Sequence, residues 1–308
     1  AVIPGANHIT ILTDARSYWQ IQQFIGATFG GASAYDPRAD DGRILWALLG
    51  VLCAFAAAFP LIALLMAGAP LAAEEAGPLP SARATWAKLG MIAGGVVITV
   101  IVLRVWSFAA DAWHVDVLQT PFTWLHMALA DYIASFAVVL ALVLVGVHRL
   151  LRRPVPWPGL ARWGWQLAVA AVCGGVLYLA IGTLATAAWA RLLVDGLRSW
   201  RFVIITLAQV PLFALFVGMF HDEPRWRGGL AHLGAFLLVC CGYVGAIALD
   251  RSLFFLSLVV PIAGLLFVAF ALLGSWLRIQ GRALGLASAA LMAGIFAWAV
   301  AAIFPIVR

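Results

Sequence analysis

Long apolar runs separated by short polar connections dominate the chain from about residue 44 onward. Eight runs are long enough to predict helices, and they cover residues 44–66, 89–106, 129–147, 165–190, 202–220, 230–249, 253–274 and 284–305. An α-helix needs about 20 residues to cross the hydrocarbon core of a bilayer. Backbone groups in lipid must pair within their own segment, and continuous apolar runs exclude the alternating pattern of a β-barrel. The pattern therefore predicts an all-α polytopic membrane domain of about eight transmembrane helices over residues 44–308.

The composition of the chain supports a membrane protein. Of its 308 residues, 65% are apolar and only 10% are charged, and the mean hydropathy is +1.03. A soluble domain carries about 25% charged residues. Tryptophans also mark the ends of the predicted spans, where an amphipathic indole prefers the membrane–water interface. These are Trp46, Trp86, Trp106, Trp163, Trp165, Trp189, Trp200, Trp226 and Trp276.

The net charge of +6 comes largely from basic residues in the short loops. Lys and Arg in such loops meet anionic headgroups and set topology, so we expect the lipid bilayer as a partner and no nucleic acid. The odd-numbered loops hold ten of them, Arg83, Lys88, Arg149, Arg152, Arg153, Arg162, Arg225, Arg227, Arg278 and Arg282. The even-numbered loops and the C-terminus hold six, Arg104, Arg191, Arg198, Arg201, Arg251 and Arg308. This count predicts that the N-terminal segment and the C-terminus lie outside, and we expect the membrane to be a bacterial inner membrane.

All four cysteines lie within apolar runs and lack the spacing of a metal site or a redox pair. They are Cys53, Cys173, Cys240 and Cys241. We interpret them as small buried apolar residues. The sequence therefore predicts neither a metal nor a cofactor.

The segment ahead of the apolar runs has a different pattern. A short apolar run ends at the turn Gly5-Ala6-Asn7, which His8 follows directly. Thr13 is a suitable N-cap for a helix over residues 14–25, whose apolar residues recur at three- and four-residue spacings. The order is therefore a strand, a turn carrying a histidine, and an amphipathic helix.

The run Val2-Ile3-Pro4-Gly5-Ala6-Asn7-His8, followed by this helix, resembles the C-terminal end of α/β-hydrolase-fold enzymes. In that family the last strand leads into a loop with the catalytic histidine and then a closing helix. The triad runs Ser, Asp or Glu, then His along the chain. The resemblance, which covers about 30 residues, implies that His8 is the catalytic histidine that relays the serine proton.

The chain departs from the family in lacking a Gly-x-Ser-x-Gly turn and an acid ahead of His8. We therefore expect an upstream hydrolase part to be missing, so that this fragment is inactive by itself. The predicted domains are a hydrolase remnant (1–30), a linker (31–43) and the membrane domain (44–308). The intact protein would be a membrane-anchored serine hydrolase acting on a small ester, amide or lipid. The alternatives are a transporter or channel-like protein, or a structural membrane protein in which His8 is a turn residue.

Several polar residues lie in or near the predicted spans. An ionisable group inside a span is costly and is a candidate for function. The second and third spans and their connection hold Arg104, Asp111, His114, Asp116, His126 and Asp131. His114 and Asp116 have side chains that bind metals, but the pattern favours a solvated loop, with Arg104 pairing with Asp111 or Asp131.

Other features of the spans favour ordinary packing. Asp250 and Arg251 predict a tight interfacial turn. Gln209 and Pro211 fall within the fifth span, where proline frees a carbonyl and allows a kink. Gly90 and Gly94 form a small-xxx-small pair that predicts close helix packing.

Overall fold

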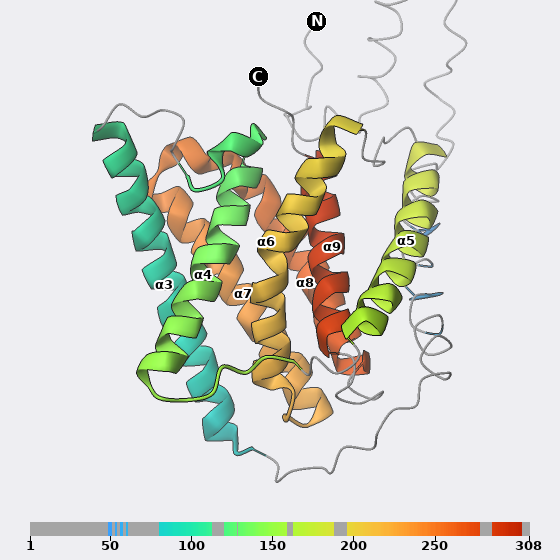
Figure 1. Cartoon of the computed structure of the whole chain (residues 1–308), viewed down its shortest axis with the longest axis horizontal. Coiled ribbons are helices and arrows are strands. Elements are labelled where there is room, and N and C mark those ends of the chain that lie inside the picture. Colours follow the sequence, from blue (N-terminus) through green and yellow to red (C-terminus); the bar gives the residue numbers. More distant parts are fainter. Residues whose placement is uncertain are drawn as a thin grey trace, which may run out of the picture. The chain divides into compact units, whose positions relative to one another are not determined.

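The structure is a computed structural model of the 308-residue chain, and its arrangement is shown in Figure 1. It describes residues 49–50, 53, 56–57, 60, 80–112, 120–127, 129–158, 163–187, 196–277 and 285–303. The chain divides into the compact units Ala1–Gly50 and Val51–Arg308. His8, the expected hydrolase remnant (1–30) and the linker (31–43) lie outside the described residues, as does most of the first predicted span, 44–66.

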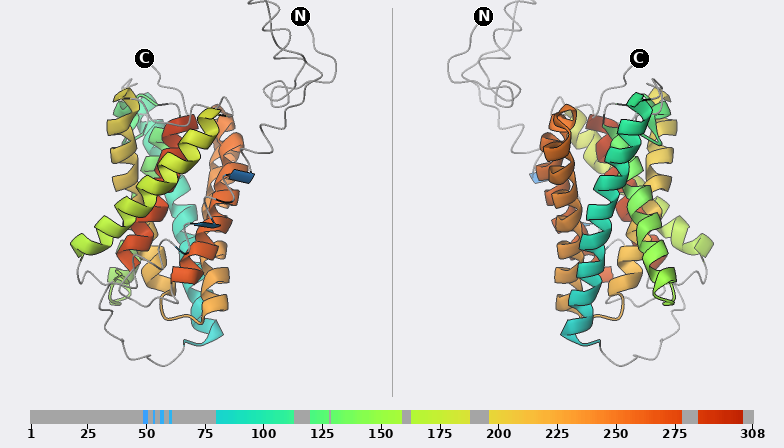
Figure 2. Two further views of the ribbon diagram at one scale, coloured as in Figure 1. Left: turned by 90° about the vertical axis from the view of Figure 1, so that its right-hand side faces the viewer. Right: turned by 90° about the vertical axis from the view of Figure 1, so that its left-hand side faces the viewer.

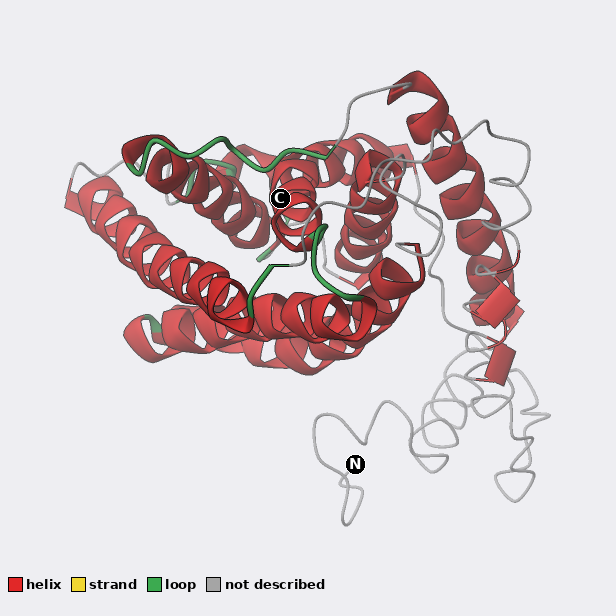
Figure 3. Cartoon of the chain, turned by 90° about the horizontal axis from the view of Figure 1, so that it is seen from below, coloured by secondary structure: helices red, strands yellow, loops and turns green. Residues whose placement is uncertain are grey.

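Helices form nearly all of the described part of the second unit. They are α3 (Ala82–Ala112), η3 (Thr123–Leu125), α4 (Ala130–Leu150), α5 (Trp163–Ala187), α6 (Gly196–Phe220), α7 (Arg225–Leu249), η4 (Arg251–Phe255), α8 (Leu256–Leu277) and α9 (Gly285–Ile303). Figure 3 shows helices and loops but no strand among these residues. The all-α character predicted for the membrane domain is therefore confirmed.

Successive helices run in alternate directions. In Figure 1, α3, α5, α7 and α9 end at the upper end of the bundle, where α4, α6 and α8 begin. α6 packs against α9 and α4, α7 packs against α3 and α8, and α3 also contacts α4. α5 packs against α9 and slants across the outside of the bundle (Figure 2).

Six of these helices are long and apolar enough to cross a membrane: Ala82–Ala110, Ala130–Leu150, Trp163–Thr183, Gly196–Phe220, Trp226–Leu249 and Gly285–Ala302. They match the second to sixth and the eighth predicted spans. The seventh falls on α8, whose apolar stretch Val259–Leu272 is shorter. The predicted span also began at residue 253, inside the 3₁₀ turn η4, whereas α8 begins at Leu256.

The outer surface of the bundle is apolar, as lipid contact requires. Leu265 is 75% exposed, and Leu142, Val105 and Leu207 are also well exposed. Trp86 and Trp226, near the starts of α3 and α7, are both 71% exposed. Exposed leucine and valine along the helices, with exposed tryptophan near their ends, fit an integral membrane protein.

Aromatic side chains fill the core between α6, α7, α8 and α9. The Phe236 ring stacks on Phe267 at 4.7 Å, and Phe267 stacks on Phe296 at 5.3 Å. Phe213 meets Phe270 edge to face at 5.8 Å. Stacked and edge-to-face rings add to the packing energy that holds helices together in lipid, where burial gives little driving force.

The prediction that Gly90 and Gly94 form a packing face is wrong. A Cβ atom at either position would meet nothing within 4 Å. The close approach occurs instead at Gly95, where a Cβ would lie 3.1 Å from side-chain atoms of Leu140 and Leu144 on α4. The contact between α3 and α4 therefore uses the adjacent glycine, on another face of α3.

Candidate functional site

Arg104 forms the principal ion pair at the upper end of the bundle. Its Nη1 donates to Oδ2 of Asp250 over 2.6 Å, and its guanidinium lies 4.1 Å from the centre of the Phe108 ring. Asp131, one of the two expected partners of Arg104, instead bonds to Thr120 and Tyr132, whereas the side chain of Asp111 lies outside the described residues. Asp250 follows directly on α7, and α7 packs against α3, which is a contact that the sequence pattern does not show.

Asp131 makes local contacts in the first turn of α4. Its carboxylate accepts hydrogen bonds from the Thr120 hydroxyl at 3.3 Å and from the Tyr132 backbone N–H at 2.8 Å. His126, five residues earlier, is exposed and has a positive φ of 48°. The structure thus does not bring His126 and Asp131 together as a pair. His114 and Asp116 lie outside the described residues.

Arg201 is a buried cation that sequence reasoning had assigned to a loop. It lies in α6 and is 8% exposed. Its Nε donates to the Leu125 carbonyl at 2.6 Å, and its guanidinium lies 4.5 Å from the centre of the Trp200 ring. Trp200 in turn stacks on Trp124 at 6.0 Å. These contacts tie the start of α6 to the η3 segment.

Gln209, in the middle of α6, is 2% exposed. Its Nε2 lies 3.4 Å from the Ile133 carbonyl of α4, which is a long hydrogen bond. Pro211 stands inside the same helix, which continues to Phe220. These residues join α4 to α6, but they do not converge with charged groups in the described part of the bundle.

The lower end of the bundle holds a second charged cluster around Glu223. Its Oε1 accepts a hydrogen bond from Lys88 Nζ at 3.2 Å, and its Oε2 accepts one from Arg227 Nε at 2.9 Å. Burial of Glu223 raises its pKa, but hydrogen bonds from Thr85 and Lys88, the charge of Lys88 and the Arg227 hydrogen bond outweigh that effect. The net pKa lies below the ordinary value, so the carboxylate is charged at neutral pH.

This cluster predicts an acid-sensitive contribution to stability. Because the folded state lowers the pKa of Glu223, the stabilisation is complete above the ordinary value of 4.5 and is lost as pH falls through the folded pKa. We expect Glu223→Gln to cost about 2 kcal/mol at neutral pH and to flatten the fall in melting temperature below about pH 4.5. Thermal unfolding of the detergent-solubilised protein at several pH values measures both effects.

The matched control is Asp222→Asn at the neighbouring position. Asp222 contacts His221 at 3.0 Å, and its side chain is 53% exposed, so this change should shift stability by no more than about 0.5 kcal/mol. Equal effects of the two substitutions would contradict the role given to Glu223.

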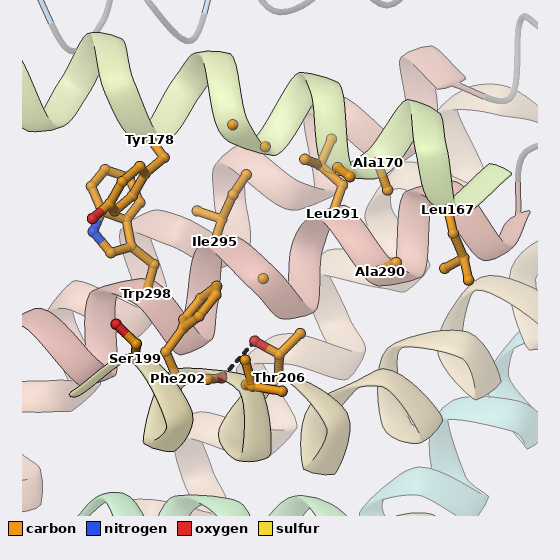
Figure 4. Close-up of a pocket in the computed structure, with 15 residues that line it drawn as sticks. Leu167, Ala170, Tyr178, Ser199, Phe202, Thr206, Ala290, Leu291, Ile295 and Trp298 are labelled. Carbon is orange, nitrogen blue, oxygen red and sulfur yellow. Dashed lines mark hydrogen bonds between the residues drawn. The ribbon is translucent and has the colours of Figure 1, made fainter. Parts of the chain in front are cut away.

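An apolar groove lies between α5, α6 and α9 (Figure 4). Its volume is about 530 Å³. Its lining residues are Leu167, Ala170, Ala171, Gly174, Gly175, Tyr178, Ser199, Phe202, Val203, Thr206, Ala290, Leu291, Gly294, Ile295 and Trp298. Sequence reasoning did not find this groove. The glycine and alanine residues of α5 and α9 are the only sequence feature that indicates a groove, because small side chains leave space. The sequence of neither helix, however, shows which neighbouring helix these residues face.

The described residues contain no group of three or more His, Cys, Asp or Glu side chains able to hold a metal ion. Comparisons with known proteins give no match: no family model, no curated protein and no solved structure resembles this chain.

Proposed function

We propose that this chain carries the catalytic histidine and the membrane domain of a membrane-anchored serine hydrolase. The observation that carries the proposal is the strand–turn–helix pattern around His8, which stands directly ahead of the apolar runs. Six helices that are long and apolar enough to cross a membrane support the proposed membrane anchor. The proposed hydrolase activity is supported only by the sequence around His8.

In this proposal His8 acts as the general base and then as the general acid. Its imidazole removes the proton of the serine hydroxyl while the serine oxygen bonds to the substrate carbonyl carbon. It then gives that proton to the departing alcohol or amine, and water repeats the cycle to release the acid. The family order requires the serine and the acid to precede His8, and residues 1–7 contain neither. The proposed activity therefore needs a serine and an acid other than any in residues 1–7.

The bundle would hold this active site at a membrane surface. Eight spans, with 44–66 and α8 added to the six long helices, would place the N-terminal segment and the C-terminus on the same side. The charge count favours the outer side of a bacterial inner membrane for both. A hydrolase in that position would meet small esters, amides or lipids that partition into the bilayer.

A transporter is the alternative, and the distribution of charge gives it less support. In the described helices, charged side chains stand within roughly two turns of a helix end. A pump or proton-coupled carrier typically uses ionisable groups deeper in the membrane. The buried Gln209 beside Pro211 is the feature that most favours a transport path.

Hydrolysis by washed membranes tests the proposed function. Membranes that contain the protein from its natural gene start should cleave a chromogenic short-chain ester, and a serine-directed organophosphorus inhibitor should abolish the activity. Membranes without the protein provide the background. Activity no higher than that background, with the protein inserted and folded, would reject the proposal for this substrate class.

A further inference from the structure

We propose that the groove between α5, α6 and α9 holds one acyl chain of an anionic phospholipid, with the headgroup at the upper end of the bundle. This site is independent of the hydrolase assignment. Its described lining comes from three helices, each long and apolar enough to cross a membrane. A lipid of the surrounding bilayer can therefore reach it through the hydrocarbon.

The size of the groove favours a lipid chain over a helix. Its volume of about 530 Å³ falls within the range of roughly 300–1,000 Å³ found for small-molecule sites. A transmembrane helix about 10 Å across and 30 Å long occupies on the order of 2,000 Å³. A flexible hydrocarbon chain can follow such a groove, whereas a helix could insert only a few side chains.

Small residues on α5 and α9 keep the groove open. A Cβ added at Gly175 or Gly294 would meet nothing within 4 Å, and one at Gly174 would first meet Leu291 at 3.5 Å. These glycines are therefore not explained by close helix packing. Space for another group remains beside them.

Three of the four polar side chains that line the groove gather at one end, while the fourth, Thr206, lies nearer its middle and donates its hydroxyl to the Phe202 carbonyl at 2.8 Å. Figure 4 shows Tyr178, Trp298 and Ser199 at this end, while Leu167 and Ala290 lie toward the other. The groove thus has an apolar length and a polar end, which is the pattern of an amphiphile. Because Ser199 stands near the start of α6 and Trp298 near the end of α9, the polar end is at the upper end of the bundle.

A basic residue, Arg198, lies close to the polar end of the groove. Arg198 precedes Ser199 and its Nη1 donates to the carbonyls of Ala301 at 3.3 Å and Ala302 at 3.0 Å. These carbonyls lie one turn beyond Trp298 on α9. The guanidinium is therefore held across the gap between α6 and α9, where it complements an anionic headgroup.

Native mass spectrometry with defined lipids tests this site. Delipidated protein in mild detergent is titrated with phosphatidylglycerol or phosphatidylcholine carrying the same chains. We expect one tightly bound lipid per chain, with phosphatidylglycerol bound roughly fivefold more tightly because one basic residue faces its headgroup. Arg198→Gln should bring the two affinities close together.

Filling the groove should expel the lipid. Gly175→Leu and Gly294→Leu each place a side chain in the open space, and we expect at least a tenfold loss of affinity from either variant. Gly90→Leu is the matched control, because it adds the same side chain to an exposed position on α3 where a Cβ meets nothing. It should bind lipid as the unaltered protein does. If one filled variant does not fold, the other decides the result.

Three results would overturn the proposal. The first is the absence of a tightly bound lipid, or equal lipid binding by the filled variants and the unaltered protein. The second is a dimer that the filled variants convert to a monomer, which would assign the groove to a second copy. The third is a disulfide between Cys53 and a cysteine introduced by Gly294→Cys, which would assign the groove to the run 44–66.

Discussion

Gly218→Ala is expected to destabilise the bundle by roughly 3 kcal/mol. Gly218 lies near the end of α6, and a Cβ there would overlap the carbonyl oxygen of Pro156. It would also come within 2.6 Å of the Pro156 carbonyl carbon. Because these are backbone atoms in the connection from α4 to α5, they cannot rotate away as a side chain can. The melting temperature of the detergent-solubilised protein should fall clearly.

Two other glycines provide a graded comparison. At Gly242 an added Cβ would lie 2.6 Å from Cζ of Phe136 and 2.8 Å from Cγ1 of Val96, which are side-chain atoms that can shift. We expect Gly242→Ala to have a smaller cost than Gly218→Ala. At Gly245 the Cβ would meet nothing within 4 Å, so Gly245→Ala should be neutral or stabilise the helix by up to about 1 kcal/mol. Equal melting temperatures for all three would show that the connection does not pack on α6 as described.

His8→Ala is expected to lower kcat/KM for ester hydrolysis by roughly 10³- to 10⁴-fold in the protein expressed from its natural gene start. Loss of the imidazole leaves the serine without a base and the leaving group without an acid. His8 precedes the apolar runs in the sequence, so membrane insertion and the melting temperature should stay unchanged. Steady-state kinetics on purified enzyme, with a melting curve for each variant, measure the effect.

His221→Ala is the control for this change. His221 lies just after α6 at the lower end of the bundle, and its Nδ1 contacts Asp222 at 3.0 Å. It should leave kcat/KM unchanged. A hydrolase that retains full activity after His8→Ala would contradict the role assigned to His8, even if the protein proves to be an enzyme.

Hydrophobicity along the chain is sufficient to predict the six long apolar helices of the described residues, because each span must satisfy its backbone within itself. The predicted span 202–220 falls within α6, and the span 129–147 begins one residue before α4 and ends inside it. The seventh span shows the limit of this reasoning. Apolar side chains continue across the 3₁₀ turn η4, so hydropathy does not separate that turn from α8.

Contacts between helices were much less predictable. The sequence suggested Asp111 or Asp131 as a partner of Arg104, but it did not indicate Asp250, which α7 supplies. It assigned the packing face of α3 to Gly90 and Gly94, but Gly95 meets α4. In both cases the answer depends on which face of a helix meets which neighbour. An all-apolar helix lacks the polar face that reveals this in a soluble protein.

The most direct test of the proposed membrane hydrolase activity is covalent labelling by a fluorophosphonate probe. The intact protein, purified from membranes, should incorporate the probe at one serine, and His8→Ala should label far more slowly at the same melting temperature. The labelled peptide should lie ahead of His8 in the chain, as the family order requires. A folded, intact protein that takes up no probe, or that labels equally fast without His8, would contradict the proposal.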